Sequence, residues 1–314
     1  MQQDSGQQTY LQKESSKMKL IKKISVGIIA YNEQENLEFL IQSLFNQKIS
    51  SQNNLVEIIV ISDGSCDSTV EIAKSFRDRR IILAKGRSRL GKNKRLNRLF
   101  KVFKGEVLIL LDADVIIKDE NTIEEIVKPF KSNKRVGLVA GNPQPLPAKT
   151  LVESSINNFI FALSNVRKNI KGGENIYGVR GPIMALSKNF AKSINIPENV
   201  PDDRFIYFMC KKLNFKFRFV EKASVLYRSP QTIKDQILQG SRWLKDKNNL
   251  KKLFDEKYFN SEYLIPFHLR IKMMFIQIRK NPLGYILMKY IHLKSLRAIN
   301  KQQWEVTFST KKLN

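Results

Sequence analysis

The chain has 314 residues, of which 42% are hydrophobic and 10% aromatic. This length and composition allow one large α/β domain or two modest ones, and they exclude a wholly disordered chain. The net charge of +26, from 55 Lys and Arg against 29 Asp and Glu, predicts a polyanionic partner such as nucleic acid, an anionic membrane face or a phosphorylated substrate.

The chain begins with a polar segment and has few cysteines. Residues 1–22 are rich in Gln, Ser and Lys, which predicts a flexible tail rather than a secretory signal. Cys66 and Cys210 are too few for a disulfide framework or a zinc cluster, and a reducing compartment fits. No apolar run approaches the ~20 residues that a membrane span needs. We therefore expect the chain to be soluble or to lie on a membrane surface.

Apolar strands alternate with helical patterns through the first half of the chain. The sequence predicts strands at 24–33, 56–65, 80–86 and 106–114 and helices at 36–47, 68–76 and 92–103. This alternation is typical of a parallel α/β sheet, in which ligands bind at the carboxyl ends of the strands. Polar residues gather at three of these ends: Asn32-Glu33, Asp63-Gly64 and Asp112-Ala113-Asp114. The sequence therefore places a candidate site along that edge.

The second half is less regular. It predicts strand-like segments at 136–145, 178–188 and 215–228 and helices at 150–170, 197–213 and 229–254. Residues 263–304 contain no acid and mix apolar with basic residues at helical spacing, with a break at Asn281-Pro282. They are too charged to span a bilayer, so we expect one or two helices lying on an anionic membrane. The alternative is a basic helical hairpin packed on the rest of the chain.

Asp112 and Asp114 form a D-x-D directly after an apolar strand. Two carboxylates at close range repel each other unless a cation or hydrogen-bond donors lie between them. In a loop that turns off the strand, both could point toward one hard cation with oxygen ligands. Mg²⁺ or Mn²⁺ would then bridge them to a diphosphate. The alternative is that both residues only cap or turn the next segment.

Five stretches resemble the family-2 inverting glycosyltransferases, which have the GT-A fold. In chain order they are AYNEQENL, VISDGSCDST, GKNKRLN, LDADV, and PDD followed by QGSRW. The resemblance covers roughly residues 23–250. It implies a mixed, mainly parallel sheet with flanking helices in a catalytic domain at 23–254. The charge and spacing of the residues that follow predict a basic amphipathic helical region at 255–314. It also implies transfer of a sugar from a nucleotide-sugar, with UDP favoured over GDP, to a glycan or lipid-linked acceptor.

The resemblance assigns the donor-binding residues. Asp112 and Asp114, with Ala113 between them, would hold the Mg²⁺ or Mn²⁺ that stabilises the leaving diphosphate. Asp63 would lie where the base binds and could accept the uracil N3–H, although Ser62 stands where many relatives have a second aspartate; a turn residue before Gly64 is the alternative. The first nucleotide-binding loop is matched by Ala30, Tyr31 and Glu33, of which Tyr31 could instead be ordinary packing.

Residues 85–104 hold nine basic residues and no acid. For most of them a solvated helix face is the better interpretation. Lys92 differs because it follows Gly91 at an expected helix start, where backbone N–H groups and a cation suit a phosphate. Relatives similar to this chain carry the same Gly-Lys, with a later Asn that Asn97 matches.

The resemblance also assigns the acceptor side. Asp202 and Asp203 match an acidic pair of which one member is the general base; alignment favours Asp203, and helix capping by both is the alternative. Gln239, Arg242 and Trp243 form Q-x-x-R-W on one helical face, and polysaccharide synthases with this motif imply that the face lies near the diphosphate and the acceptor. Arg242 would neutralise the leaving phosphate and Trp243 would offer a platform to a sugar ring. Otherwise Trp243 belongs to the core and Arg242 to the surface.

Direct displacement with inversion needs no covalent enzyme nucleophile, and none is evident, because the two histidines, His268 and His292, lie far downstream. Synthases with Q-x-x-R-W often carry transmembrane helices where this chain has its charged segment. This departure favours an enzyme that lies on the cytoplasmic face of a membrane and adds one or few sugars.

Three other functions are weighed against this one. A nucleic-acid-binding protein without activity would explain the charge but not carboxylates at three strand ends, so no nucleic acid is expected as a partner. A sugar-phosphate nucleotidyltransferase would carry a Gly-rich loop where AYNEQENL stands. A binding module that has lost its activity would not need the retained acids. The sugar, the acceptor and the oligomeric state stay open.

Overall fold

The structure, a computed structural model, describes residues 23–51, 53–299, 310 and 313. The tail predicted at 1–22 lies outside these residues. In the part of the chain that is described, eight strands form one sheet in the order β3-β2-β1-β4-β7-β6-β8-β5. The first four strands in sequence are parallel neighbours, which confirms the predicted α/β sheet. They are β1 (Ile24–Ala30), β2 (Leu55–Ser62), β3 (Ile81–Lys85) and β4 (Val107–Asp112).

The other half of the sheet is mixed. Its strands are β5 (Val115–Ile117), β6 (Val136–Pro145), β7 (Ile183–Ser187) and β8 (Lys216–Tyr227). β7 runs antiparallel between β4 and β6, whereas β8 is parallel to β6 and antiparallel to β5. The sheet is therefore mixed and mainly parallel, as the resemblance implied.

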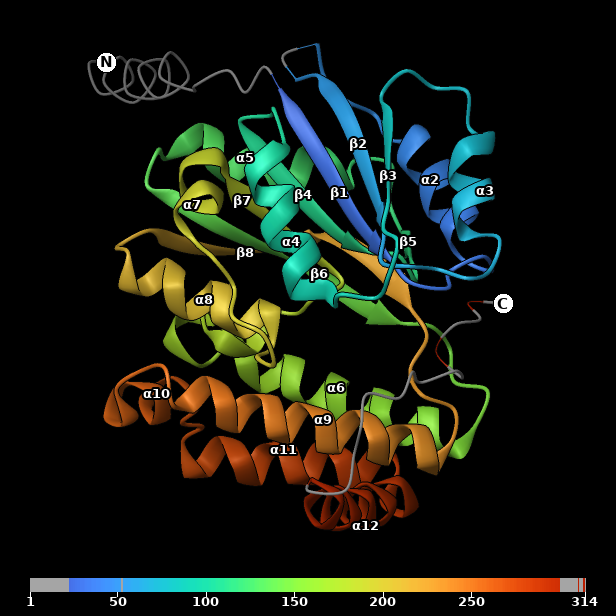
Figure 1. Cartoon of the computed structure of the whole chain (residues 1–314). Helices are drawn as coiled ribbons and strands as arrows, with labels where there is room; N and C mark the ends of the chain where they lie inside the picture. The colour runs from blue at the N-terminus through green and yellow to red at the C-terminus, as the bar shows by residue number, and fades with distance from the viewer. Residues whose placement is uncertain (1–22, 52, 300–309, 311–312, 314) are drawn as a thin grey trace, which may run out of the picture.

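Helices cover both faces of the sheet, as Figure 1 shows. Along β4, Val107, Ile109 and Leu111 join the core on one face, and Leu108 and Leu110 join the core on the other. Each is nearly inaccessible to solvent, and burying such a side chain contributes about 1.5–3 kcal/mol. The helices on the first face are α2 (Leu37–Phe45), α3 (Thr69–Ser75) and α5 (Thr122–Ser132). Those on the second are α4 (Lys92–Val102), α7 (Lys188–Ser193) and α8 (Asp202–Lys212).

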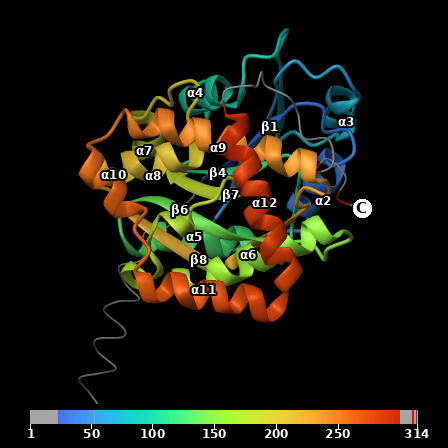
Figure 2. The ribbon, with the colours of Figure 1, turned by 90° about the horizontal axis from the view of Figure 1, so that it is seen from below.

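A further helical layer lies beneath the sheet in Figure 1. It consists of α6 (Leu151–Arg167), two short 3₁₀ helices, η1 (Lys171–Gly173) and η2 (Ile176–Gly178), then α9 (Ile233–Lys251), α10 (Glu256–Glu262), α11 (Phe267–Lys280) and α12 (Pro282–Ala298). Both α11 and α12 pack on α6, and α12 also packs on α9. Figure 2, seen from below, shows α12 crossing in front of α9.

The break between α11 and α12 falls at Asn281, as predicted. The Asn281 side chain accepts a hydrogen bond from the backbone N–H of Gly284 at 2.8 Å, and Pro282 occupies the first turn of α12, a position where its missing N–H costs nothing. Among the described residues, no helix combines the length and the apolar character that crossing a membrane requires. Cys66 is exposed, Cys210 is buried, and neither is in a disulfide.

Candidate active site

A pocket of about 660 Å³ lies at the carboxyl ends of β1, β2 and β4. Its walls come from the loops that follow these strands, the first turn of α4, the loop before α8 and one face of α9. It brings together eleven of the predicted site residues, namely Tyr31, Glu33, Asp63, Lys92, Asp112, Ala113, Asp114, Asp202, Gln239, Arg242 and Trp243. Ala30 and Asp203 do not line it. Ala30 is buried at the end of β1, where its carbonyl accepts the backbone N–H of Asp63 at 2.8 Å.

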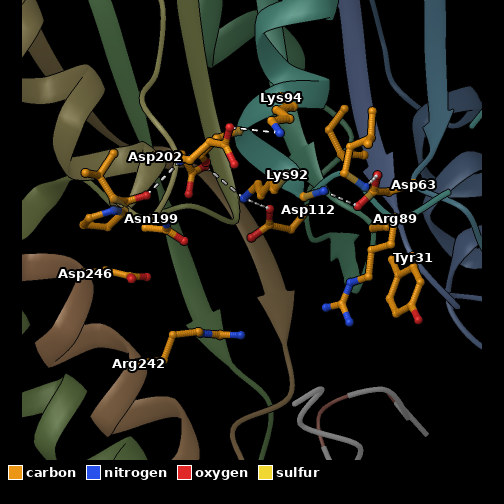
Figure 3. Close-up of a pocket in the computed structure, with 18 of the residues that line it drawn as sticks. Tyr31, Asp63, Arg89, Lys92, Lys94, Asp112, Asn199, Asp202, Arg242 and Asp246 are labelled. Carbon is orange, nitrogen blue, oxygen red and sulfur yellow. Dashed lines mark hydrogen bonds and ion pairs between the residues drawn. The ribbon is translucent and has the colours of Figure 1, made fainter. Parts of the chain in front are cut away.

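Lys92 lies between two of the pocket carboxylates. Its Nζ is 2.6 Å from Oδ1 of Asp112 and 3.0 Å from Oδ2 of Asp202, as Figure 3 shows. Partial burial alone would lower the pKa of Lys92, but the charges of Asp112 and Asp202 outweigh it and raise the pKa above its usual value. Lys92 is therefore an ammonium at neutral pH, and it relieves the repulsion among the acids at this end of the sheet.

The D-x-D residues, Asp112 and Asp114, are candidate ligands for a divalent cation. Asp112 and Asp114 both line the pocket, and the backbone at Gly181 lies close to Asp112, since a Cβ there would be only 3.3 Å from Oδ2 of Asp112. Among the residues that the structure describes, no group of three or more acidic, His or Cys side chains is placed to hold a metal. Mg²⁺ and Mn²⁺ are often held by one or two carboxylates that phosphate oxygens and water complete. The donor set fits a cation that binds together with a diphosphate.

Asp63 organises the loop that leads into α4. Its carboxylate is almost fully buried and accepts three hydrogen bonds: from the backbone N–H groups of Leu90 at 2.8 Å and Gly91 at 2.9 Å, and from Nε of Arg95 at 2.7 Å. Each carboxylate oxygen can accept twice, so a base contact would come in addition to this structural role. Lys92 directly follows Gly91 in the chain, so its position depends on the hydrogen bonds that Asp63 accepts from Leu90 and Gly91.

The buried pair of Asp63 and Arg95 predicts a large effect on stability. Arg95→Met is expected to lower the free energy of unfolding by about 3 kcal/mol, because it leaves a buried carboxylate without its cation. Urea unfolding measures this change. The control is Arg98→Met on the exposed face of the same helix, which should stay within about 0.5 kcal/mol of the wild type. Equal stabilities of the two variants would contradict the role given to this pair.

Two further features shape the wall near Asp63. Gly64 has φ +75°, and a Cβ there would lie 2.6 Å from the carbonyl carbon of Ser88, so glycine allows the loop at 86–91 to pack closely against β2. From this loop the Arg89 guanidinium lies 4.2 Å from the centre of the Tyr31 ring, and both residues line the pocket (Figure 3). The sequence did not single out Arg89, because it lies within a run of nine basic residues.

The loop before α8 is tied to α4. The Asn93 side chain donates to the carbonyls of Pro197 at 2.7 Å and Val200 at 2.9 Å. These bonds position Asp202 and Asp203, the first two residues of α8, where the positive end of the helix dipole favours acids.

The two acids of α8 have different surroundings. Asp202 lines the pocket and pairs with Lys92, whereas the Asp203 carboxylate accepts the backbone N–H of Arg204 at 2.7 Å. Burial raises the pKa of Asp203 above its usual value; Arg204 opposes the rise and Asp202 adds to it. Asp203 thus binds a proton more tightly than an exposed aspartate does. Asp202 is the acid of the pair that lines the pocket.

The face of α9 that carries Gln239, Arg242 and Trp243 forms another wall. Trp243 is 40% exposed, so it is not a core residue. In Figure 3, Arg242 extends from the side of the pocket opposite Lys92 and Asp112. Asp246 also lines the pocket, and burial raises its pKa, with Arg242 opposing the rise. Asp246 was not among the predicted site residues, although its spacing of four from Arg242 places it on the same helical face.

Comparisons with known proteins agree with this fold. The mannosyltransferase PcManGT from Pyrobaculum calidifontis, solved with GDP-Man and Mn²⁺, matches with a TM-score of 0.55 and 13% identity over 95% of this chain and 84% of that chain. The glucosyl-3-phosphoglycerate synthase from Mycobacterium tuberculosis, solved with Mn²⁺, UDP and phosphoglyceric acid, matches with a TM-score of 0.51 and 17% identity over 78% of this chain and 81% of that one. The fold is therefore the GT-A fold of glycosyltransferases.

The chain also matches the model of glycosyl transferase family 2 over residues 25–194, more than half of its 314 residues. It therefore belongs to this family. Among curated relatives, the poly-β-1,6-N-acetyl-D-glucosamine synthase of Staphylococcus epidermidis is 25% identical over 230 residues, which are 70% of this chain and 53% of the synthase. The chain thus spans about half the length of the curated relatives it matches.

Proposed function

We propose that this glycosyltransferase moves a sugar, with inversion, from a nucleotide-sugar to a hydroxyl of a glycan or lipid-linked acceptor, and that the nucleotide is UDP. The observation that carries the proposal is the meeting of the D-x-D carboxylates, Lys92, Asp202 and the Q-x-x-R-W face around one pocket. The solved neighbours that hold UDP or GDP-Man with Mn²⁺, and the relatives that are named poly-β-1,6-N-acetyl-D-glucosamine synthases, support the same class of reaction.

The donor would lie across the strand ends. Asp112 and Asp114 are the residues that would hold Mg²⁺ or Mn²⁺, which supplies electrostatic stabilisation of the diphosphate leaving group when bound. Lys92 and Arg242 approach the pocket from opposite sides, so their charges would neutralise the phosphates from both. The nucleotide base of the donor would lie at the end of the pocket formed by Tyr31 and Asp63.

In the transfer step, Asp203 would take the proton of the acceptor hydroxyl while that oxygen attacks the anomeric carbon. The bond from this carbon to the phosphate oxygen breaks, and the diphosphate leaves with the electron pair. The resemblance and the raised pKa favour Asp203 as the base, and Asp202 is held by Lys92. Asp203 does not line the pocket in this structure, and catalytic contacts often tighten only in the complex with substrate. Gln239 and Trp243 would face the acceptor sugar.

A screen of UDP- and GDP-sugars for metal-dependent thermal stabilisation tests the donor class, because a ligand that binds only the folded enzyme raises its melting temperature. We expect stabilisation by a UDP-sugar with Mn²⁺ and its loss with EDTA. Salt-sensitive stabilisation by oligonucleotides with none by any sugar nucleotide would favour the nucleic-acid-binding alternative.

We also propose that the outer face of α11 and α12 docks on an anionic membrane, on its cytoplasmic side. Exposed apolar residues repeat at helical spacing along this face: Phe267, Phe275 and Ile278 on α11, and Leu283, Ile286, Tyr290 and Leu293 on α12. Seven Lys and Arg and no acid lie within 263–299. Apolar side chains flanked by cations complement a bilayer surface of anionic lipids.

Sedimentation with vesicles tests this surface. Phe275 and Ile286 are 63% and 64% exposed, so changing both to Gln should leave the fold intact and reduce binding to phosphatidylglycerol vesicles about 10-fold or more. Val102→Gln, at an exposed position on α4, should bind like the wild type. Equal binding of the double variant, or a wild-type dimer that the double variant turns into a monomer, would overturn the membrane assignment.

A further inference from the structure

The backbone at Lys92 is held in place by hydrogen bonds, whereas its charged side chain is long and flexible. The N–H groups of the two preceding residues, Leu90 and Gly91, are held by the buried carboxylate of Asp63, and Lys92 itself begins α4. Its side chain is 37% exposed and carries the ammonium on a flexible stem of four carbons. The α-carbon is therefore anchored, whereas the ammonium lies at the end of a flexible and partly exposed side chain.

The ammonium occupies a place that matters for cation binding. It forms an ion pair with Oδ1 of Asp112, one of the two D-x-D carboxylates, at 2.6 Å, and lies 3.0 Å from Oδ2 of Asp202. The second of these oxygens is buried from solvent. A divalent cation on Asp112 would lie close to this ammonium, and like charges at such distances repel strongly in a partly buried site.

The backbone at Gly181 lies beside the pair formed by Asp112 and Lys92. A Cβ on Gly181 would lie 3.3 Å from Oδ2 of Asp112 and 3.7 Å from Nζ of Lys92. The contact with Asp112 would be tight, so glycine at this position allows the backbone to lie close to the Asp112 carboxylate.

We propose that, in the nucleotide-free enzyme, Lys92 acts as an internal cation that holds Asp112 and Asp202 together and keeps the affinity of the D-x-D carboxylates for divalent ions low. The proposal rests on the proposed function, because the phosphates of the donor are the anions that would draw the ammonium away from Asp112. Metal and nucleotide then bind with positive coupling, which is reciprocal by linkage. Lys92 is a positioning residue in the empty enzyme and a phosphate ligand in the loaded one.

Binding of Mn²⁺ to the nucleotide-free protein, followed by electron paramagnetic resonance, tests the proposal without any catalytic readout. We expect Lys92→Met to bind Mn²⁺ about 10-fold more tightly than the wild type, because an uncharged side chain of similar length replaces the ammonium. Lys92→Arg, which keeps the charge, should resemble the wild type. The matched control is Lys94→Met: Lys94 also lines the pocket but pairs with Glu198 at 2.9 Å, and its loss should change Mn²⁺ affinity less than 3-fold.

Two outcomes separate this proposal from the proposed function. If Lys92→Met binds Mn²⁺ no more tightly than the wild type while circular dichroism shows both folded, the internal-cation role is wrong whatever the enzyme transfers. If the variant binds Mn²⁺ more tightly but UDP does not raise the Mn²⁺ affinity of the wild type, Lys92 acts as proposed and the donor assignment fails instead. With both correct, UDP raises Mn²⁺ affinity more in the wild type than in Lys92→Met.

Discussion

Replacing Asp114 by alanine is expected to lower the affinity for UDP in the presence of Mn²⁺ by about 100-fold or more. Asp114 lies in the turn after β4 and lines the pocket beside Asp112. With only two carboxylates to hold the cation, losing one removes half of the protein's ligands, and even indirect partners of a metal are worth 10–100-fold in affinity. Calorimetric titration of UDP into the variant measures the effect.

Asp119→Ala is the matched control for this titration. Asp119 is an exposed aspartate just after β5 and does not line the pocket, so its removal should leave the affinity for UDP unchanged. The same affinity in Asp114→Ala as in this control would refute the metal assignment.

Changing Asp203 to asparagine is expected to leave donor binding within about 3-fold and to lower kcat by about 100- to 10,000-fold, the range that general base catalysis contributes. The amide preserves the shape of the side chain but has no basic oxygen. Titration with the donor and a transfer assay on the same preparation separate the two quantities.

Asp202→Asn supplies the contrast. Because Asp202 pairs with Lys92, this variant should alter donor binding as well as transfer. If Asp202→Asn abolishes transfer and Asp203→Asn transfers at the wild-type rate, the base is Asp202, the acid that lines the pocket.

Much of the fold could be predicted because its signals are local. The apolar run at Val107–Leu111 is buried on both faces, so it reads as a central strand wherever it lies in the sheet. The break at Asn281-Pro282 follows from proline chemistry alone. The packing of α12 on α9 and α6 could not be predicted in the same way, because α12 has apolar residues on its buried side, such as Ile291, and on its exposed side, such as Leu283 and Ile286.

In the site too, some features could be predicted from the sequence and others depend on contacts between distant segments. Asp63 directly follows β2 and Asp112 ends β4, and both strands belong to the parallel part of the sheet. That the two acids lie at the same edge of the sheet therefore follows from topology. The contacts that assign roles within that edge are long-range: Lys92 to Asp202 and Asp63 to Arg95 join segments far apart in the chain. The sequence supplied the acids at 202 and 203, but which of them enters the pocket depends on how Asn93 holds the preceding loop.

The most direct measurement is anomalous diffraction at the manganese edge from crystals grown with Mn²⁺ and UDP. We expect one strong peak within ligand distance of the Asp112 and Asp114 carboxylates and of the UDP diphosphate, with the Lys92 ammonium moved from Asp112 to a phosphate. UDP bound away from this pocket, or bound in it with no manganese at these two carboxylates, would show that the proposed metal-assisted transfer is wrong.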